Sequence, residues 1–570
     1  MTQSFPTVCH KYASDVVAGR APACRWVKLA CQRHLADLDR STDASFPYRF
    51  DEAKATRPCR FIQALPHVKG RWAAERQLLR LEPWQVFIVA NIFGWVRKDN
   101  GLRKHRQAFL LIPRKNGKSP LAAGIGLYML TCDDPVEVGA EIYCGATSEK
   151  QAWEVFRPAK LMADKTPDLQ SALGVSINAK SIVTANGSRF EPVIGKPGDG
   201  ASVSLGICDE YHEADTAILY DTFKTGMVGR QQPLLLVITT AGYNVASPCH
   251  DLQLEAQKVL EGTLEDDQLF SMIFTVDADT DWTGEEALRL ANPNLGISVD
   301  ETALQHDQEQ AVQNPAKQNV FKTKHLNIWC NASSAWLNMQ RWKECEDHSL
   351  EPEQFVNDSL VMAVDLASTT DLSSAVKVFT RTIDGKPHYY IFGRHYLPEA
   401  KIGLPENQHY QRWNLAVPPV LMATDGASID YPLIERDLRA DISTYKVREI
   451  CFDKTYAGQM MQQLAATGVT TVEVPQKVMY LSPAMKALEA AVADGRCHHN
   501  GDPVLTWCLS NVVAHADAND NYFPRKEKPN LKIDAAVALI TAFARVASTP
   551  DPNKKPSAND IYERRGVRTL

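Results

Sequence analysis

Long hydrophobic runs are missing from this sequence. Among its 570 residues, no stretch approaches the roughly 18 uninterrupted apolar residues of a membrane-spanning helix, so we expect no membrane span. The first residues, MTQSFPTVCHKYASDVV, also lack the charged-then-apolar order of a secretory signal. Both absences predict a protein that is made and kept in a cytoplasm.

Paired cysteine motifs and an excess of positive charge are missing too. The 13 cysteines are scattered singly without a C-x-x-C pair, which predicts reduced thiols. The cluster Cys497-His498-His499 has no partners at zinc-finger spacing, and we interpret it as a loop. A formal net charge of −6 excludes a protein coated in positive charge, although a local basic stripe could still hold nucleic acid.

The chain shows no internal repeat and no low-complexity block. Its hydrophobic content of 44% and charged content of 23% are typical of a globular protein. From about residue 75 to 245, buried strand-like runs alternate with helical patterns, which indicates a parallel sheet covered on both faces. In the C-terminal half, short polar turns between strand-like runs indicate antiparallel pairing. We therefore predict an α/β protein with a parallel sheet followed by a mixed sheet.

These patterns divide the chain into segments. At roughly 100–200 residues per domain, two to four domains are expected. The predicted segments are a helical extension (1–60), a first α/β domain (61–335) with a lid or linker subdomain (246–335), a linker (336–355), a second α/β domain (356–548) and a flexible tail (549–570).

The stretch IPRKNGKSPL, residues 112–121, resembles a phosphate-binding P-loop that lacks its first glycine. It ends in Gly117-Lys118-Ser119, but the regular pattern places a glycine where Ile112 stands. An apolar run before it supplies a strand, and a helix after it would aim its N-terminal amides at phosphate. Lys118 could then reach the β and γ oxygens, and Ser119 could hold magnesium. Taken alone, the stretch fits a chance tripeptide in a basic loop equally well.

Two acids further along the chain favour the nucleotide site. Asp209 and Glu210 end the apolar strand-like run 205–208. At such a strand end the first acid holds magnesium, and Glu210 is placed to polarise the attacking water. The alternative is a purely structural one, in which Asp209 and Glu210 only begin a helix after a buried strand. Because both motifs occur in order, each on the expected element, we predict hydrolysis of ATP or GTP.

Weaker candidates surround this site. Gln85 could read the adenine edge with its amide, while Trp84 beside it fits core packing at least as well as base stacking. Thr240 ends a strand in hydroxyls, as a coupling strand would. Asn116 belongs to the predicted nucleotide-binding loop.

An arginine is also expected to contact the γ-phosphate. Arg114 lies within the loop, and Arg230 precedes the Thr240 strand, from where it could reach into a neighbouring subunit. Either arginine could equally be an ordinary surface residue.

Three aspartates stand out in the C-terminal half. Asp365 and Asp453 each end a strand, and Asp534 opens the last helix. In an RNase H-like fold these places converge at one sheet edge, where like charges require metal. Two Mg²⁺ or Mn²⁺ ions would activate water and stabilise the leaving oxygen of a phosphodiester, with Asp371 as an outer or fourth ligand. The alternative is three independent cap or turn acids, since Asp is common at helix N-termini.

These motifs together resemble one protein family. PRKNGKS, CDE and ITTAG are followed by AVDLASTTD, FDKTYA and KIDAAVALI, with HLNIW before AVDLASTTD and PVLTWCLSN before KIDAAVALI. In this order they resemble the large terminase subunit of tailed double-stranded DNA bacteriophages. The likeness covers about residues 65 to 547, and nothing in the first 60 residues matches.

The resemblance implies a DNA-packaging motor. It implies a P-loop ATPase domain that translocates double-stranded DNA into a procapsid, and an RNase H-like nuclease domain that cuts concatemeric DNA. The implied partners are the portal protein, the small terminase subunit and further copies of the chain, in a pentameric ring on the portal. The implied place is the cytoplasm of the infected host, outside the mature virion. The family's site residues map onto Lys118, Ser119, Asp209, Glu210, Thr240, Asp365, Asp453 and Asp534.

Three alternatives remain open at this point. One is a helicase-like translocase whose second domain is only a clamp. Another is an RNase H-like recombinase with an ATP-dependent regulator, which suits the domain order less well. A third is a portal-binding scaffold with degenerate sites, and the missing glycine is its only support.

Overall fold

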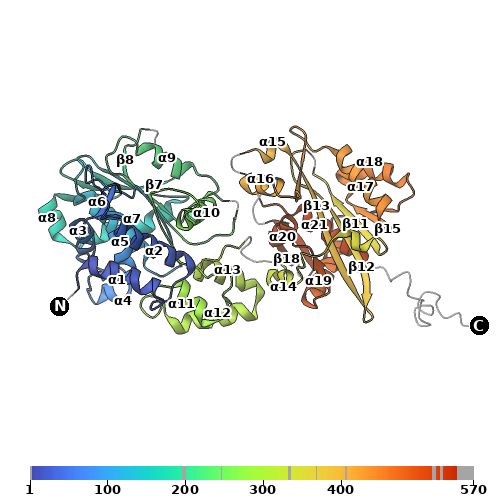
Figure 1. Ribbon diagram of the computed structural model, residues 1–570, viewed down its shortest axis with the longest axis horizontal. Coiled ribbons are helices and arrows are strands. Elements are labelled where there is room, and N and C mark those ends of the chain that lie inside the picture. The colour runs from blue at the N-terminus through green and yellow to red at the C-terminus, as the bar shows by residue number, and fades with distance from the viewer. Residues whose placement is uncertain are drawn as a thin grey trace, which may run out of the picture. The chain divides into compact units, whose positions relative to one another are not determined.

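The chain folds into two compact units, Met1–Ser333 and Ser334–Leu570, in a computed structural model (Figure 1). The predicted tail, 549–570, lies outside the part of the chain that the structure describes. The described residues are 3–194, 200–245, 247–330, 336–367, 369–404, 407–516, 521–526 and 531–547.

The first unit is built on an eight-stranded sheet in the order β10-β3-β9-β8-β4-β7-β6-β5. Strands β10 to β7 run parallel, and β5 and β6 add an antiparallel edge. The bounds are β3 Gln107–Leu111, β4 Glu141–Ala146, β5 Val175–Ile177, β6 Ile182–Thr184, β7 Arg189–Ile194, β8 Val203–Asp209, β9 Leu234–Thr239 and β10 Leu269–Ile273.

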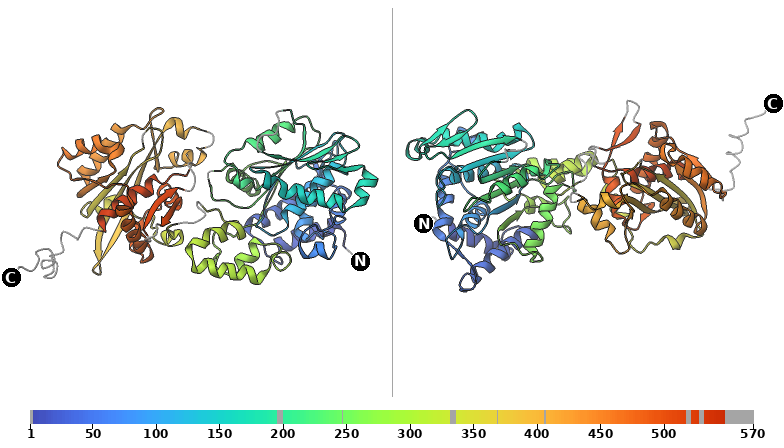
Figure 2. Two further views of the ribbon diagram at one scale, coloured as in Figure 1. Left: turned by 180° about the vertical axis from the view of Figure 1, so that it is seen from behind. Right: turned by 90° about the horizontal axis from the view of Figure 1, so that it is seen from above.

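Helices cover both faces of this sheet, which confirms the α/β prediction (Figure 2). In β4 the Cys144 thiol donates to a carbonyl of α7, whereas a Cβ on the next residue, Gly145, would meet Leu219 of α9. Successive residues of a strand face opposite sides, so α7 and α9 lie on opposite faces. The helices around the sheet are α6 Lys118–Thr131, α7 Glu149–Asp164, α8 Pro167–Leu173, α9 Ile218–Gly226 and α10 Pro248–Glu261, with the short η1 Tyr211–Glu213.

Sequence patterns missed strand β10. The predicted lid or linker subdomain begins at residue 246, yet Leu269–Ile273 pairs in parallel with β3 and all five of its residues are buried. This short run, LFSMI, is buried on both faces, so its pattern cannot separate strand from helix. After β10, the helices α11 Glu285–Ala291, α12 Glu301–Gln313 and α13 Pro315–His325 enclose a small apolar cluster of their own within the first unit.

The first 60 residues are helical, as expected, and they share the core of the first unit. The apolar side chains of α1 and α2 belong to the same hydrophobic cluster as the strands. Helix α1 packs on α5, and α2 packs on β10. The elements here are α1 Phe5–Val17, α2 Arg25–Arg40, β1 Tyr48–Phe50, α3 Glu52–Gln63, α4 Gly70–Ala74, α5 Pro83–Gly94 and β2 Trp95–Arg97, with β1 paired to β2.

The second unit has a mixed sheet in the order β14-β13-β12-β11-β15-β16, with β17 beside β13. The predicted antiparallel meander is observed as β11, β12 and β13, and β15 joins β11 in parallel. Helix α21 packs across β11 and β12. The strands are β11 Ser359–Asp365, β12 Ser373–Ile383, β13 Lys386–Pro398, β14 Leu421–Thr424, β15 Val447–Phe452, β16 Thr471–Glu473 and β17 Cys497–His499, and β18 Val512–Ala516 pairs with β19 Tyr522–Lys526.

The helices of the second unit flank this sheet. They are α14 Met339–Glu344, η2 Pro352–Phe355, α15 Glu399–Ile402, α16 Gln408–Asn414, α17 Tyr431–Thr444, α18 Lys454–Ala465, α19 Val478–Ala493, α20 Pro503–Ser510 and α21 Asp534–Val546.

The loop interpretation of Cys497-His498-His499 was wrong, because these residues form β17 and pair with β13. The His499 ring stacks on Trp342 at 4.0 Å between centroids, and Trp342 is 1% exposed. Trp342 lies on α14, within the predicted linker 336–355, so the apolar residues of this segment pack on the second unit.

The cysteines are unpaired: all 13 are free thiols, most of them buried. No helix in the described ranges has both the length and the apolar character needed to cross a membrane.

Candidate active sites

The loop that carries Gly117, Lys118 and Ser119 joins β3 to α6, and its geometry explains the missing glycine. Ile112 still follows the strand, since its N–H donates to the Thr239 carbonyl of β9 at 2.9 Å. The left-handed positions of the loop are instead Lys115, with φ of 69°, and Gly117, with φ of 81°. A Cβ on Gly117 would come within 3.3 Å of the Gln85 amide nitrogen. Glycine is therefore required at residue 117 and not at residue 112.

Lys118 meets the acids that end β8. Its Nζ is 3.1 Å from Glu210 Oε1 and has no hydrogen-bond partner among the described residues, although the atom is buried. A buried ammonium with unused donors fits a phosphate oxygen as ligand. Glu210 has φ of 48°, a left-handed backbone that costs a non-glycine residue about 1–3 kcal/mol and is concentrated at functional sites.

The two acids differ in charge state. Burial, and then the neighbouring Glu210 charge, raises the pKa of Asp209 to about 7. Burial also acts to raise the pKa of Glu210, but the Lys118 and His212 charges outweigh it and hold that pKa below its ordinary value. An ionised Glu210 suits the polarisation of water, and a divalent cation at Asp209 would offset the cost of its buried charge.

His212 is a residue that the motifs did not identify. Its Nδ1 is 3.2 Å from Glu210 Oε2, and its Nε2 is 3.2 Å from Glu213 Oε1 and 3.1 Å from Lys324 Nζ. The backbone carbonyl of Lys324 also accepts the Arg114 N–H at 3.0 Å. Helix α13 is thus connected to both Glu210 and the P-loop. Only the position of His212, two residues after Glu210, could have pointed to it.

We expect Lys324→Met to slow ATP hydrolysis about tenfold without changing the KM for ATP. The substitution removes a charged contact that positions His212 beside Glu210, and hydrogen bonds to charged groups contribute about 1.5 kcal/mol, roughly a factor of ten in rate. Steady-state kinetics measures the split between kcat and KM. The matched control is Lys317→Met, an exposed lysine on the same helix that contacts only Gln310 Oε1, at 2.6 Å. An unchanged kcat for Lys324→Met would contradict this positioning role.

Asn116, predicted to bind nucleotide, uses its side chain inside the protein. Its amide donates to Asn292 Oδ1 at 2.9 Å and accepts from the Asn294 N–H at 3.0 Å. Asn294 Oδ1 in turn accepts the Trp84 indole N–H at 2.7 Å. The side-chain amide of Asn292 and the backbone of Asn294 thus hold the P-loop in place. Trp84 is thereby part of the core, 3% exposed.

The side-chain oxygen of Gln85 is already used in a hydrogen bond, so only its NH₂ group is available to a ligand. Its Oε1 accepts the Glu82 N–H at 3.0 Å in a capping box at the start of α5. Only the NH₂ group faces the P-loop, so paired reading of an adenine edge by both halves of the amide would require this cap to open.

The two candidate arginines lie in different places. The Arg230 guanidinium donates to the carbonyls of Ser202 and Gly139 at 2.8 Å each. These residues precede β8 and β4, so Arg230 lies at the amino ends of the parallel strands, whereas Asp209 lies at the carboxyl end of β8. Arg114 has an exposed side chain, and its charge helps to lower the pKa of Glu210. Thr240 is fully buried and donates to the Ala241 carbonyl at 3.1 Å.

In the second unit the three predicted aspartates converge. Asp365 ends β11 and Asp453 directly follows β15, and the preceding residues Val364 and Phe452 are paired in the parallel ladder. Asp534 begins α21, which packs on β11. Burial, followed by the charges of Asp534 and Asp453, raises the pKa of Asp365 well above its ordinary value.

Asp371 and Lys532 flank these acids. Burial, and then the Asp371 charge, raises the pKa of Asp534 to about 6. Lys532 Nζ donates to Asp371 at 2.7 Å. Gln476 donates to Asp365 Oδ1 at 3.4 Å. Lys532 and Lys526 both act on Asp534, so two lysines against four acids still leave an excess of negative charge. Carboxylate oxygens in such a cluster fit divalent cations such as Mg²⁺ and Mn²⁺.

A buried lysine–glutamate pair on a parallel sheet, followed by converging acids on a mixed sheet, defines a P-loop ATPase joined to an RNase H-like nuclease. The comparisons agree with this class. Residues 83–258 match the family model "Terminase large subunit, ATPase domain", and residues 263–549 match "Terminase large subunit, endonuclease domain". The chain belongs to the terminase large subunit family. It is therefore an ATPase and endonuclease of DNA packaging that uses a nucleotide and divalent metal.

Similar proteins cover most of the chain. Protein YmfN of Escherichia coli (strain K12) is 41% identical over 385 residues, 66% of this chain and 84% of that protein. The terminase large subunit of Enterobacteria phage HK97 is 27% identical over 475 residues, 81% of this chain and 90% of that protein. The crystal structure of the HK97 large terminase covers 86% of this chain and 99% of its own, with 26% identity and a TM-score of 0.43.

Proposed function

We propose that the P-loop unit hydrolyses ATP with four residues in defined roles. Lys118 holds the β and γ phosphates, and Ser119 and Asp209 hold Mg²⁺, which neutralises phosphate charge when bound. Glu210 orients and deprotonates the attacking water. The observation that carries this proposal is the buried Lys118 ammonium, 3.1 Å from Glu210 and without a hydrogen-bond partner in the described chain.

The arginine that completes the site is proposed to be Arg114. Its exposed side chain and its effect on Glu210 support a place near the γ-phosphate. A trans role for Arg230 has less support, since that guanidinium is held by two carbonyls of its own chain. Thr240 is proposed to couple hydrolysis to movement through β9, because it adjoins Thr239, which contacts His212 at 3.0 Å.

For the second unit we propose a two-metal endonuclease on double-stranded DNA. Asp365, Asp453 and Asp534 would hold two Mg²⁺ or Mn²⁺ ions, with Asp371 as an outer ligand. Such ions activate water and stabilise the leaving oxygen when bound. Arg525 and Lys526 on β19 would hold the DNA backbone. The nearby Lys528 would serve the same role and lies outside the described residues.

The assembly is proposed from the family. The chain would form a homo-oligomeric ring, a pentamer on the portal protein, and receive DNA through a small terminase subunit. It would act in the cytoplasm of the infected host and be absent from the mature virion. Size-exclusion chromatography with light scattering, with and without purified portal, tests the ring.

Double-stranded DNA is expected to stimulate the ATPase severalfold at low salt and less at high salt. Phosphate contacts release counterions, so affinity falls steeply as salt rises. ATPase rates with and without linear duplex at about 50 and 200 mM salt provide the measurement. A rate that ignores duplex DNA at both concentrations would contradict a translocating motor and favour a recombinase regulator.

Metal affinity of the nuclease site is expected to fall as pH drops through about 6. Asp534 has a pKa of about 6, so below that pH it binds a proton that a metal must displace, and the raised pKa of Asp365 acts in the same direction. Each displaced proton weakens binding about tenfold per pH unit below the pKa, whereas above it the affinity is constant. Calorimetric Mn²⁺ titrations at several pH values give the curve. A flat profile through pH 6 would show that these acids are not the ligands.

A further inference from the structure

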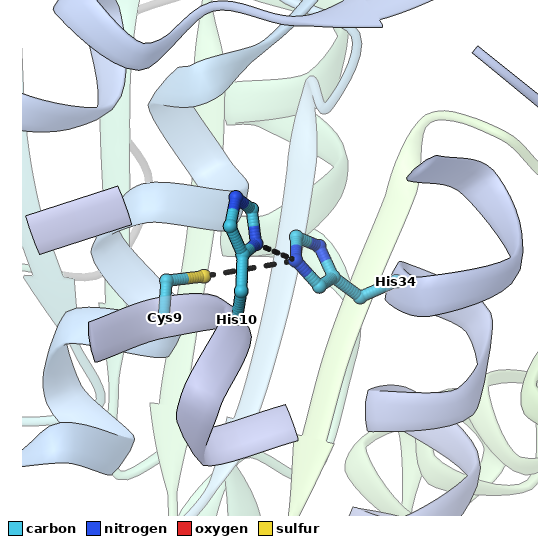
Figure 3. A group of neighbouring side chains, drawn as sticks. All are labelled: Cys9, His10 and His34. Carbon is cyan, nitrogen blue, oxygen red and sulfur yellow. Dashed lines mark hydrogen bonds between the residues drawn. The ribbon is translucent and has the colours of Figure 1, made fainter. Parts of the chain in front are cut away.

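A group of potential metal ligands lies in the first unit, away from the P-loop acids (Figure 3). Cys9 and His10 come from α1, and His34 comes from α2. His34 Nε2 is 3.8 Å from Cys9 Sγ and 3.0 Å from His10 Nδ1. All three atoms lie within 4.8 Å of one another, which no other set of three Cys, His, Asp or Glu residues achieves in the described chain.

The surroundings of His34 orient its ring toward this group. The Asn91 amide donates to the Phe87 carbonyl at 2.8 Å, so its Oδ1 faces His34 Nδ1, also at 2.8 Å. Nδ1–H then donates to Asn91, and Nε2 presents its lone pair to Cys9 and His10. The Trp95 indole N–H also points at this Nδ1, at 3.2 Å, where it competes as a donor, and the shorter Asn91 contact favours the Nδ1–H tautomer. A ligating histidine typically has its second ring nitrogen fixed in this way.

The spacing of the three atoms is close to that of a tetrahedral ion. With Zn–N bonds of about 2.0–2.1 Å and a Zn–S bond of about 2.3 Å, neighbouring ligand atoms lie roughly 3.3–3.6 Å apart. The two spacings to His34, 3.0 and 3.8 Å, bracket this range, and the spacing between Cys9 and His10 is within 4.8 Å. Cys9 is fully buried and His34 is 3% exposed, whereas His10 is half-buried, so three protein ligands would leave one coordination position open on the His10 side.

We propose that Cys9, His10 and His34 bind one Zn²⁺ ion that joins α1 to α2. One thiolate and two imidazoles form a ligand set that binds Zn²⁺ in preference to Mg²⁺, whereas the carboxylates of the two active sites suit Mg²⁺. Binding forms three bonds to the metal and releases the Cys9 thiol proton to solvent, with no change of oxidation state. A water molecule fills the fourth position.

This metal site would stabilise the N-terminal helices α1 and α2, which contain none of the recognised motifs. Asn91 belongs to α5, the helix whose first turn carries Gln85 beside the P-loop. A metal between α1 and α2, backed by Asn91, would fix both helices against α5. The competing explanation is a hydrogen-bonded core network that never takes a metal, and it is an outcome of the test below.

Cobalt is the probe, because a cysteine ligand produces a sulfur-to-cobalt charge-transfer band in the near ultraviolet. The full chain is treated with chelator, the chelator is removed, and Co²⁺ is titrated. We expect the band to saturate at one Co²⁺ per chain, and one equivalent of Zn²⁺ to abolish it. The carboxylate sites also take Co²⁺ but offer only oxygen ligands, so they do not produce this band. The readout is independent of ATPase and nuclease activity.

Variants separate the ligands from other buried residues nearby. Cys9→Ser should remove the band, and His10→Gln should weaken Co²⁺ binding at least tenfold. The matched control is Cys31→Ser, another fully buried cysteine on α2, which should keep the band. Thermal melting shows whether each variant folds, and the zinc competition on wild type needs no variant. No sulfur band in wild type at stoichiometric Co²⁺, or a band that survives Cys9→Ser, would overturn the proposal in favour of the hydrogen-bonded network.

Discussion

We expect Lys118→Ala to abolish DNA-stimulated ATP hydrolysis while metal-dependent nicking of plasmid DNA continues. The substitution removes the one ammonium that is buried between the P-loop and Glu210. Loss of a preorganised charge donor at a transition state typically costs about 10²–10³-fold in rate. We expect an effect of at least that size, because Glu210 also loses the charge that keeps its pKa low. Phosphate release at saturating ATP measures it.

The control for Lys118 is Lys150→Ala, an exposed lysine at the start of α7. It should retain wild-type hydrolysis. Thermal melting of both variants separates lost chemistry from lost folding. ATPase activity retained by a well-folded Lys118→Ala protein would exclude this loop as the nucleotide site.

We expect Asp365→Ala to eliminate DNA cleavage and to leave ATP hydrolysis intact. Burial raises the pKa of Asp365 most, and the charges of Asp534 and Asp453 raise that pKa further. Without this carboxylate the cluster cannot hold metal in a productive geometry. Metal stabilisation of several kcal/mol corresponds to about 10³-fold or more in rate. Conversion of supercoiled plasmid to nicked and linear forms, with Mg²⁺ and with Mn²⁺, is the measurement.

The control for Asp365 is Asp384→Asn, in the exposed turn between β12 and β13. Asp384 has φ of 49°, a conformation that asparagine also tolerates, and it lies at the far end of the meander. This variant should cut DNA normally. Persistent cutting by purified Asp365→Ala protein would refute the proposed nuclease site.

Several features could be predicted because the motif residues are close together in the chain. Gly117, Lys118 and Ser119 lie on one strand–turn–helix unit, so local geometry alone aims them at a phosphate. The strand ends at Asp365 and Asp453 were likewise readable from apolar runs. The short β10 could not be recognised, since a run of five residues that is buried on both faces carries no clear periodic signal.

Other features were hidden because they depend on contacts between distant segments. His212 and Lys324 meet across 112 residues of sequence, and Asn116 meets Asn294 across 178. Sequence spacing also suggested that Arg230 could act as a finger, whereas two backbone carbonyls hold it at the opposite sheet edge. The site of Cys9, His10 and His34 forms only where α1, α2 and α5 meet.

By itself, the sequence determined the two kinds of chemistry in this protein and their order along the chain, because each reactive group is carried by a short, continuous motif. The tertiary structure decided which side chains are free to react. It ended the strand at Ile112 with a hydrogen bond to the Thr239 carbonyl of β9 and occupied the Asn116 side chain within the protein. It also left the Lys118 ammonium in an ion pair with Glu210 but without a hydrogen-bond partner in the described chain. The physical reason is that burial and hydrogen-bond partners come from packing between distant segments, whereas a motif specifies only its own local backbone.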